Sequence, residues 1–280
     1  MKLGVYSLVT PDYRVDDAAG LVAETGHEGI EWTVDYKNAV WDGTSRWHID
    51  TANLEESARA ARAAAERHGL TVVSLGTAVS CFDLDGARTC MEVARIVGAP
   101  MLRVAGPRYD GKTPYQELFE KARAAYVEVE KAARAAGVKA LLELHHGLIC
   151  TNTSSALRLL EGRDPRWVGV ILDPANMVRE GIENWKMACE ILGPYLAHVH
   201  TKNDRWVRRE DGTWFCEHCG IDEGIVDWKE VIAALKSVGY DGWLNLEDLQ
   251  GGWACKPVGI TTREKLERGH RFLSALLQGE

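Results

Sequence analysis

Two acidic residues interrupt an apolar run near the end of the chain. The run LNLEDL, at 244–249, has the character of a buried strand, yet it contains Glu247 and Asp248. A strand of a parallel sheet that is covered on both faces is almost entirely apolar. A buried ionised group is tolerated when it is paired with an opposite charge or binds a metal. The run therefore predicts a cation beside Glu247.

Three other strand-like runs carry a comparable side chain near their ends. KALLELHHG ends in Glu143 and His145, VGVILDPAN in Asp173 and LAHVHTKN in His198, His200 and Lys202. Side chains alternate along a strand, so His198, His200 and Lys202 share one face, and Asn245 shares another with Glu247. We expect Asn245 and Glu247 to point inward, because Leu244 and Leu246 suit packing against helices.

Glu143, Asp173, His200 and Glu247 together suit a metal site. Carboxylates that share one pocket repel each other unless a cation is present. Three carboxylates and one imidazole are ligands for one divalent ion, with Mn²⁺ the first choice and Mg²⁺, Co²⁺ and Zn²⁺ as alternatives. Any one of these residues could instead form a structural salt bridge. Their recurrence on four successive strands favours the metal. Arg103 and Glu31 are expected either in a core ion pair or at the substrate.

The elements that would carry these residues alternate regularly along the chain. Helical periodicity marks 53–69, 115–137 and 261–278. Strand-like runs lie at 3–9, 29–34, 71–78, 101–107, 139–147, 168–176, 196–203 and 242–249. Eight strands, each followed by a helix, predict a (β/α)₈ TIM barrel, an α/β fold with a single domain over 1–280. The competing open, doubly wound sheet usually has a glycine-rich turn after its first strand, and LVTPDY is not one.

Two loops are longer than routine connections, at 35–50 and 204–226. Each follows the carboxyl end of a strand, where barrel enzymes build their sites, so we expect both to close over a substrate. They contain Trp41, Trp47, Trp206 and Trp214, whose rings serve either as sugar-stacking faces or as ordinary packing.

Composition narrows the classes of function. The chain has 280 residues and a formal charge of −8, which disfavours a general affinity for nucleic acid. No apolar run is long enough to span a membrane, and the first residues do not resemble a signal peptide. Seven scattered cysteines fit reduced thiols, so we expect a cytoplasmic protein. CEHC, at 216–219, is expected to hold ordinary thiols rather than a zinc knuckle or a redox pair.

ELHHG, LDPANM, HVHTKN and GIVDWKEVIAALKSVGYDGWLNLE resemble the xylose isomerase-like TIM barrels, in the group of sugar phosphate isomerases and epimerases. Relatives in this family include ketose 3-epimerases, inosose isomerases and dehydratases, and abasic-site endonucleases. The resemblance is strong over 139–249 and looser in the first half, where GIEW carries it. It implies that Glu143, Asp173, His200 and Glu247 bind one divalent metal, and that the two glutamates also move the proton.

The sequence departs from the ketose 3-epimerases in three places. Asn176 stands where those enzymes have a histidine, a different loop carries His145 and His146, and Arg205 matches their arginine only approximately. These differences concern the substrate more than the metal. The predicted substrate contacts are His145, Asn176, Lys202, Arg205 and Trp32.

The predicted activity is that of a divalent-metal-dependent isomerase or epimerase. It would act on a ketose or a related polyhydroxy carbonyl compound by proton abstraction through a metal-bound enediolate. Loss of a β-hydroxyl or a carboxylate from the same intermediate would make it a dehydratase or a decarboxylase. An abasic-site endonuclease and a non-catalytic metal-binding barrel are less favoured. The expected partner is a small sugar or sugar-derived ketone, not nucleic acid or a membrane, and self-association is left open.

Overall fold

Eight parallel strands form a closed barrel, which confirms the predicted (β/α)₈ fold. The computed structural model describes residues 1–36, 48–251 and 259–279. Neighbouring strands follow the order β1, β11, β8, β7, β6, β5, β4, β2, and β2 pairs with β1 to close the circle. The strands are β1 (Lys2–Tyr6), β2 (Gly29–Asp35), β4 (Thr71–Gly76), β5 (Met101–Arg103), β6 (Lys139–Glu143), β7 (Val168–Leu172), β8 (Leu196–Thr201) and β11 (Trp243–Leu246).

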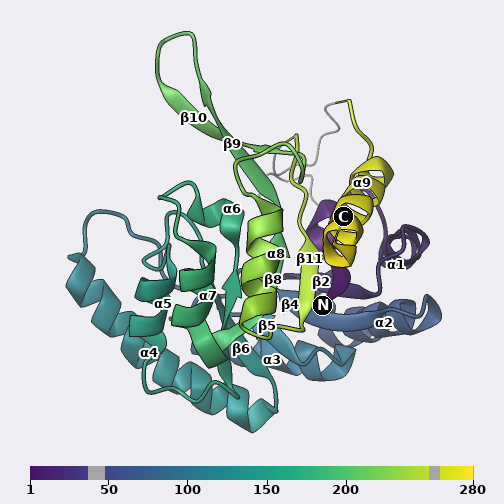
Figure 1. Ribbon diagram of the computed structural model, residues 1–280. Helices are drawn as coiled ribbons and strands as arrows, with labels where there is room; N and C mark the ends of the chain where they lie inside the picture. The colour runs from purple at the N-terminus through teal and green to yellow at the C-terminus, as the bar shows by residue number, and fades with distance from the viewer. Residues whose placement is uncertain (37–47, 252–258, 280) are drawn as a thin grey trace.

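Helices connect successive strands and pack around the barrel (Figure 1). The helices are α1 (Val15–Glu24), α2 (Leu54–Arg67), α3 (Leu84–Val97), α4 (Tyr115–Ala136), α5 (Thr153–Leu160), α6 (Pro174–Met177), α7 (Trp185–Leu192), α8 (Trp228–Ser237) and α9 (Thr262–Gln278). Short 3₁₀ turns are η1 (Ser7–Val9), η2 (Thr51–Asn53) and η3 (Gly193–Tyr195). The predicted helices at 53–69, 115–137 and 261–278 correspond to α2, α4 and α9. None of the described helices has the length and apolar character needed to cross a bilayer.

Helix ends are set by local sequence. The Thr261 hydroxyl accepts a hydrogen bond from the backbone N–H of Glu264, and the Glu264 carboxylate accepts one from the Thr261 backbone, so α9 starts at a capping box. The C-terminal end of α3 is set by Gly98, whose φ of 86° is favourable only for glycine.

The strands end earlier than their apolar runs suggest. β7 ends at Leu172, and Asp173 accepts a hydrogen bond from the backbone N–H of Asn176 to begin α6. β6 ends at Glu143. Polar side chains that follow a strand are thereby held at the carboxyl edge of the barrel, where neighbouring strands also end.

The predicted loop 204–226 contains an antiparallel hairpin of β9 (Asn203–Arg208) and β10 (Trp214–Cys219), which projects beyond the barrel (Figure 1). The short strand β3 (Ile49–Asp50) extends the sheet beside β2. Most of the other predicted loop, including Trp41 and Trp47, lies outside the described residues. Its expected closure over a substrate stays a prediction.

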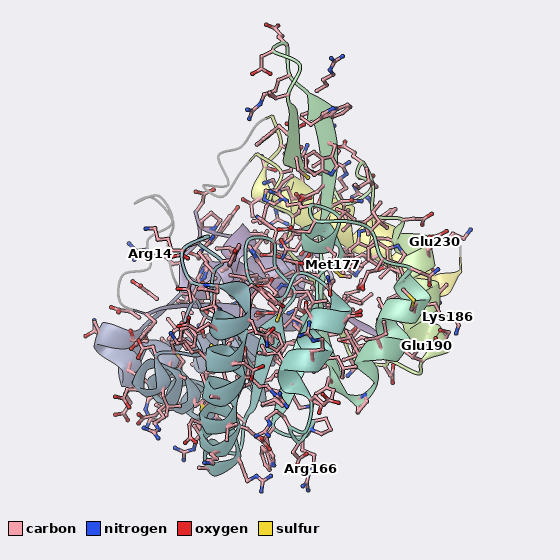
Figure 2. The ribbon with its side chains drawn as sticks, turned by 90° about the vertical axis from the view of Figure 1, so that its left-hand side faces the viewer. Arg14, Arg166, Met177, Lys186, Glu190 and Glu230 are labelled. Atoms are coloured by element: carbon pink, nitrogen blue, oxygen red, sulfur yellow. The ribbon has the colours of Figure 1, made fainter. Side chains whose placement is uncertain are left out.

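Charged side chains divide between the surface and the barrel interior. Figure 2 shows Arg166, Lys186, Glu190 and Glu230 at the periphery of the molecule. A barrel interior is usually filled by branched apolar residues. Here it also holds buried polar and charged side chains, namely Glu31, Arg103, Glu143, His198, His200 and Asn245. Polar and charged groups therefore fill part of this interior in addition to apolar packing.

One buried histidine outside this region makes a pH-dependent contribution to stability. His27 lies between α1 and β2; its ring Nδ1 is 3.1 Å from the Thr25 hydroxyl, and its ring centroid is 5.2 Å from that of His270. Burial, and then the charge of His270, lower the pKa of His27 to about 3. In an unfolded chain a histidine titrates near pH 6.5.

The unfolded state therefore binds a proton that the folded state excludes, so the His27 contribution is complete above about pH 6.5 and declines as the pH falls toward the folded pKa. We expect the titration of His27 to lower the free energy of unfolding by about 2 kcal/mol as the pH falls from 7 to 5. Urea unfolding of the wild type and of His27→Gln at both pH values measures this contribution of His27 to the free energy of unfolding. An equal difference between the two proteins at pH 7 and pH 5 would contradict the expectation.

Candidate metal and active site

The four predicted metal ligands lie together at the carboxyl edge of the barrel. β6 ends with Glu143, Asp173 follows β7, His200 lies in β8 and Glu247 follows β11. One ligand atom from each side chain lies within 4.8 Å of those of the others, and all four side chains are buried. Three carboxylates and one imidazole at this spacing fit one divalent ion. That they bind a metal remains a prediction.

His200 stands at the centre of this cluster. Its Nδ1 atom lies 3.2 Å from Glu143 Oε1, 3.5 Å from Glu247 Oε2 and 4.0 Å from Asp173 Oδ2. The Tyr6 ring stacks on the imidazole with a centroid distance of 5.3 Å. Burial alone would lower the pKa of His200, but the surrounding carboxylates, Glu31 foremost, raise it well above its usual value. A single nitrogen thus faces all three predicted carboxylate ligands.

Two buried cations contact the same carboxylates. Lys202 Nζ lies 2.7 Å from Asp173 Oδ2 and 2.6 Å from Glu247 Oε2, and Arg103 Nη1 lies 2.9 Å from Glu143 Oε2. Although burial opposes ionisation, Arg103 holds the pKa of Glu143 well below its usual value, and Lys202 lowers that of Glu247.

Asp173 titrates differently from the two glutamates. Burial raises its pKa to about 7; Lys202 opposes this shift, whereas the charges of Glu247 and Glu143 add to it. The cluster thus does not fully compensate its own negative charge.

In the protonation state that metal binding requires, with His200 neutral and Asp173 ionised, the interior cluster would have a charge deficit that one divalent ion fills. Four buried carboxylates, Glu31, Glu143, Asp173 and Glu247, face the two fixed cations Arg103 and Lys202. With every carboxylate ionised and His200 neutral, two negative charges remain, which equals the charge of one divalent cation. This balance agrees with the donor set.

Three of the predicted substrate contacts border the cluster. Asn176 Nδ2 donates to Asp173 Oδ2 at 2.7 Å, while its Oδ1 lies 3.0 Å from His146 Nδ1. The ring of His145 stacks on that of His146, and burial lowers the pKa of His145 to about 4. Lys202, described above, is the third. His145 is thus a neutral side chain near the predicted metal ligands at neutral pH.

The other two predicted substrate contacts lie elsewhere. Trp32 is adjacent to Glu31 in β2, so it points to the opposite face of the strand, where it is fully buried against His48 at a ring distance of 5.3 Å. Arg205 lies on β9, where its half-exposed guanidinium pairs with Glu217 at 2.7 Å. The chain leaves the barrel after Lys202, which carries Arg205 onto the hairpin.

A buried polar network anchors the base of that hairpin. The Asp204 carboxylate accepts from Arg179 Nε at 2.5 Å and lies 2.6 Å from His218 Nδ1. Trp206 Nε1 donates to the backbone oxygen of Val178 at 3.3 Å, which joins β9 to the end of α6. Sequence reasoning missed this network, since Arg179 and Asp204 carry no spacing that distinguishes them. Trp206 and Trp214 are exposed by 41% and 63%, and their predicted stacking on a substrate stays a prediction.

The CEHC segment forms part of β10 rather than a loop. Cys216 and Cys219 are three positions apart on this strand, so their side chains point to opposite faces. Their Cα atoms are separated by about 10 Å, beyond the span of a disulfide. Both thiols are free, and burial raises their pKa values to about 11 and about 12. These observations agree with the expectation of ordinary buried thiols.

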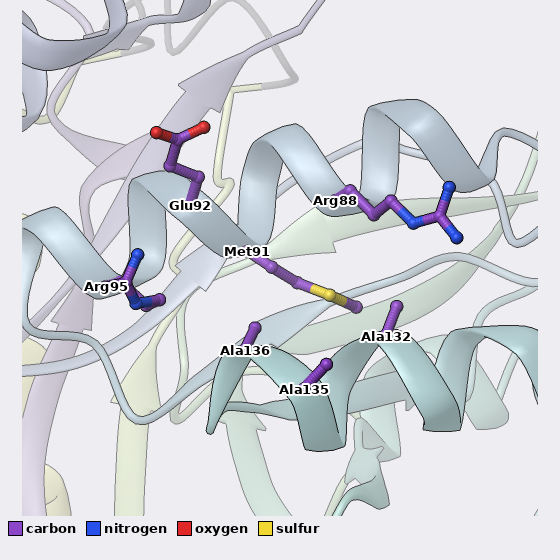
Figure 3. A pocket seen from close by; sticks show the side chains of 7 residues that line it. All are labelled: Arg88, Met91, Glu92, Arg95, Ala132, Ala135 and Ala136. Atoms are coloured by element: carbon purple, nitrogen blue, oxygen red, sulfur yellow. The ribbon is translucent and has the colours of Figure 1, made fainter.

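A surface groove between α3 and α4 has a different character (Figure 3). It has a volume of about 470 Å³ and is lined by Arg88, Met91, Glu92, Arg95, Ala132, Ala135 and Ala136. It lies in the outer helical layer, away from the barrel interior, and Arg88 pairs with Asp85 at 3.1 Å. The groove offers neither a nucleophile nor a ligand set, so we place the chemistry at the barrel end.

Comparison with known proteins agrees with the barrel fold. The sequence model of the family described as xylose isomerase-like TIM barrel matches residues 19–276. An inosose dehydratase from Geobacillus thermodenitrificans is 27% identical over 121 residues, which is 40% of this chain and 40% of that protein. The match thus spans well under half the length of this curated relative.

Two solved structures have the same overall shape. The IOLI protein with a bound zinc atom superposes with a TM-score of 0.75 at 16% identity, covering 99% of this chain and 98% of that one. A D-allulose 3-epimerase from Methylomonas sp. superposes with a TM-score of 0.72 at 18% identity, covering 99% and 98%. At such identities these structures establish the fold and not the reaction.

Proposed function

The chain belongs to the xylose isomerase-like TIM barrel family, and on that premise we propose that it is a divalent-metal-dependent sugar isomerase or epimerase. Its substrate would be a ketose or a related polyhydroxy carbonyl compound. The observation that carries the proposal is the arrangement around His200 Nδ1, which faces Glu143, Asp173 and Glu247 within 4.0 Å. Two of these carboxylates can exchange a proton with a substrate held between them.

The metal would be held by Glu143, Asp173, His200 and Glu247. A mostly oxygen donor set with one imidazole suits Mn²⁺ best among the common divalent ions, with Mg²⁺, Co²⁺ and Zn²⁺ as alternatives. When bound, such an ion polarises a carbonyl and an adjacent hydroxyl, which acidifies the C–H bond beside the carbonyl.

Glu143 and Glu247 would act as the acid and base. They come from β6 and β11, which are separated in the barrel by β7 and β8. One carboxylate removes the proton beside the carbonyl, and the other returns a proton to the opposite face or to the neighbouring carbon. Arg103 and Lys202 lower the pKa values of Glu143 and Glu247, so both begin ionised at neutral pH. His145, Asn176 and Lys202 are close enough to this cluster to orient the substrate hydroxyls.

A lyase acting at the same site is the second candidate. It is favoured by the sequence similarity to an inosose dehydratase. Removal of the same proton would begin that reaction, and the intermediate would then lose a β-hydroxyl as water instead of accepting a proton on carbon. A keto-inositol or an oxo-sugar would be the substrate in that case.

The experiment that tests the proposal is a screen in heavy water followed by NMR. Chelator-treated protein, with and without added Mn²⁺, is incubated with ketoses, inososes and 3-oxo-sugars. We expect metal-dependent deuterium incorporation at the carbon beside the carbonyl of at least one substrate. An epimer or isomer as product supports the isomerase, and a dehydrated product supports the lyase. Metal-loaded protein that converts and labels none of these compounds would refute both.

A further inference from the structure

Glu31 occupies a position in the barrel interior that the proposed chemistry does not use directly. It lies in β2 with no solvent exposure. One of its carboxylate oxygens, Oε2, lies 2.9 Å from His198 Nε2, 3.1 Å from His200 Nε2 and 2.9 Å from Asn245 Nδ2. These partners come from β8 and β11, neither of which neighbours β2 in the barrel. Glu31 therefore spans the interior.

The chemistry of an ionised carboxylate determines the direction of these hydrogen bonds. A carboxylate can only accept, so each ring nitrogen at this distance must carry a proton. His198 and His200 both donate from Nε2 to the same oxygen, and the Asn245 amide is the third donor. In its neutral form, His200 then has its lone pair on Nδ1, because the other nitrogen holds the proton.

Nδ1 is the nitrogen that faces the predicted metal ligands. If Glu31 were absent, the neutral ring could adopt the other tautomer and donate from Nδ1 to Glu143 Oε1, which lies 3.2 Å away. That tautomer has no lone pair for a metal on the side of the carboxylates. Histidine ligands of metals commonly donate their second ring N–H to a carboxylate, which fixes the tautomer and raises ligand basicity.

Two other readings of Glu31 agree less well with the contacts. Glu31, His198 and His200 offer ligand atoms within 4.8 Å of one another, as a second metal site would. However, Nε2 of His198 and Nε2 of His200 lie at hydrogen-bond distance from the same Glu31 oxygen. A metal ion between these groups would require both nitrogens to be unprotonated. A substrate contact is disfavoured because three donors, from His198, His200 and Asn245, occupy one oxygen of Glu31, on the side of the His200 ring opposite to the carboxylate cluster.

We infer that Glu31 is a positioning residue that holds His200 with Nδ1 free to ligate, and that its charge strengthens metal binding. The inference rests on the proposed function in that it takes His200 as a ligand. Glu31 itself would touch neither metal nor substrate. It would bind the ring N–H of His200 on the side away from the carboxylate ligands, while His198 and Asn245 hold Glu31 in place.

Metal affinity and the state of the His200 ring test this role. Zn²⁺ serves as the diamagnetic probe, its affinity is measured by competition with a chromophoric chelator, and the ring is observed by ¹⁵N NMR. In the zinc-loaded wild type we expect a downfield, slowly exchanging Nε2–H resonance for His200. Glu31→Met removes the acceptor and the charge while nearly preserving side-chain length. We expect it to weaken zinc binding about 10- to 100-fold and to abolish that resonance.

Two further variants separate the effect of the Glu31 charge from a general disturbance of the barrel interior. Glu31→Gln keeps an acceptor oxygen but removes the charge, so it should weaken zinc binding about 10-fold and shift the Nε2–H resonance upfield. This variant decides the question if Glu31→Met does not fold. His198→Gln changes another donor to the same oxygen, on a side chain whose ring packs edge-on against His200 at 5.3 Å without a hydrogen bond to it. Because the glutamine amide can still donate an N–H to Glu31, this variant should keep Glu31 in place and change the affinity less than about threefold.

Different results would refute the metal site and the positioning role of Glu31. A wild type that binds no stoichiometric Zn²⁺ refutes the metal site and the role of Glu31 together. A wild type that binds Zn²⁺, with Glu31→Gln equal to it in affinity and in the His200 resonance, refutes only the positioning role. Equal losses in Glu31→Gln and His198→Gln also overturn it, because a general disturbance of the interior would then explain both.

Discussion

Replacing His200 with alanine and Glu247 with glutamine in one chain should abolish stoichiometric metal binding. The double variant removes the only imidazole of the predicted ligand set and turns one of its three carboxylates into a weaker, neutral ligand. We expect elemental analysis to find about one divalent ion per wild-type chain and almost none in the variant, because a site that loses two of four protein ligands no longer competes with water.

Thermal unfolding gives an independent measure of metal binding. A ligand that binds only the folded state stabilises it by about 2.7 kcal/mol at a hundredfold excess over its dissociation constant. Added Mn²⁺ should therefore raise the Tm of the wild type by several degrees and leave that of the double variant unchanged. A matched control, His68→Ala with Glu217→Gln, removes the same residue types outside the barrel interior and should behave as the wild type. Equal metal content in the wild type and the double variant would rule out the assignment.

Strand periodicity explains why the clustering of the four predicted ligands could be anticipated from the sequence. Each of Glu143, Asp173, His200 and Glu247 lies at or just after the carboxyl end of a strand, and parallel strands of a closed barrel end on one face. Once the eight strands are recognised, the alternation of side chains decides which residues point inward. His200 and Lys202 follow from the same rule, since they are two positions apart.

Contacts across the barrel could not be predicted in this way. Glu31 meets His198, His200 and Asn245, although β2 neighbours neither β8 nor β11. Such contacts depend on the diameter and stagger of the closed barrel, which the pattern of a single strand does not contain. A charged residue in the apolar run GIEWTV indicates that Glu31 needs a polar partner. The run does not indicate which residues that partner comes from.

Two predicted substrate contacts, Trp32 and Arg205, lie apart from the cluster for local reasons. Trp32 was predicted to contact the substrate, yet its neighbour Glu31 takes the inward position, so alternation alone directs Trp32 outward. Arg205 is three residues beyond Lys202, and only the pairing of β9 with β10 carries it away from the barrel. A hairpin that begins directly after a barrel strand has the same extended backbone as the strand, so its start leaves little mark in the sequence.

Glu143→Gln and Glu247→Gln should each lower turnover about 10²- to 10⁴-fold on a polyhydroxy ketone, with a much smaller effect on substrate binding. Glutamine keeps the size of the side chain but removes its basicity. Because both residues are also predicted ligands, turnover is measured at saturating Mn²⁺ with metal content determined for each protein. Asp173→Asn is the matched control: it also replaces a ligand carboxylate, it can still cap α6, and it has no proposed part in proton transfer. It should retain more activity than either glutamine variant.

Deuterium exchange between the substrate and heavy water distinguishes the roles of Glu143 and Glu247. If they act on opposite faces of the substrate, each variant should lose exchange from one epimer of a substrate pair and keep it from the other, because the remaining base still reaches its own face. Return of a shielded proton can hide exchange, so a primary isotope effect with C-deuterated substrate is measured beside it. Turnover with neither exchange nor isotope effect would exclude the enediolate route. Loss of exchange from both epimers in both variants would instead refute separate bases, since two carboxylates that come from strands on either side of β8 should fail independently.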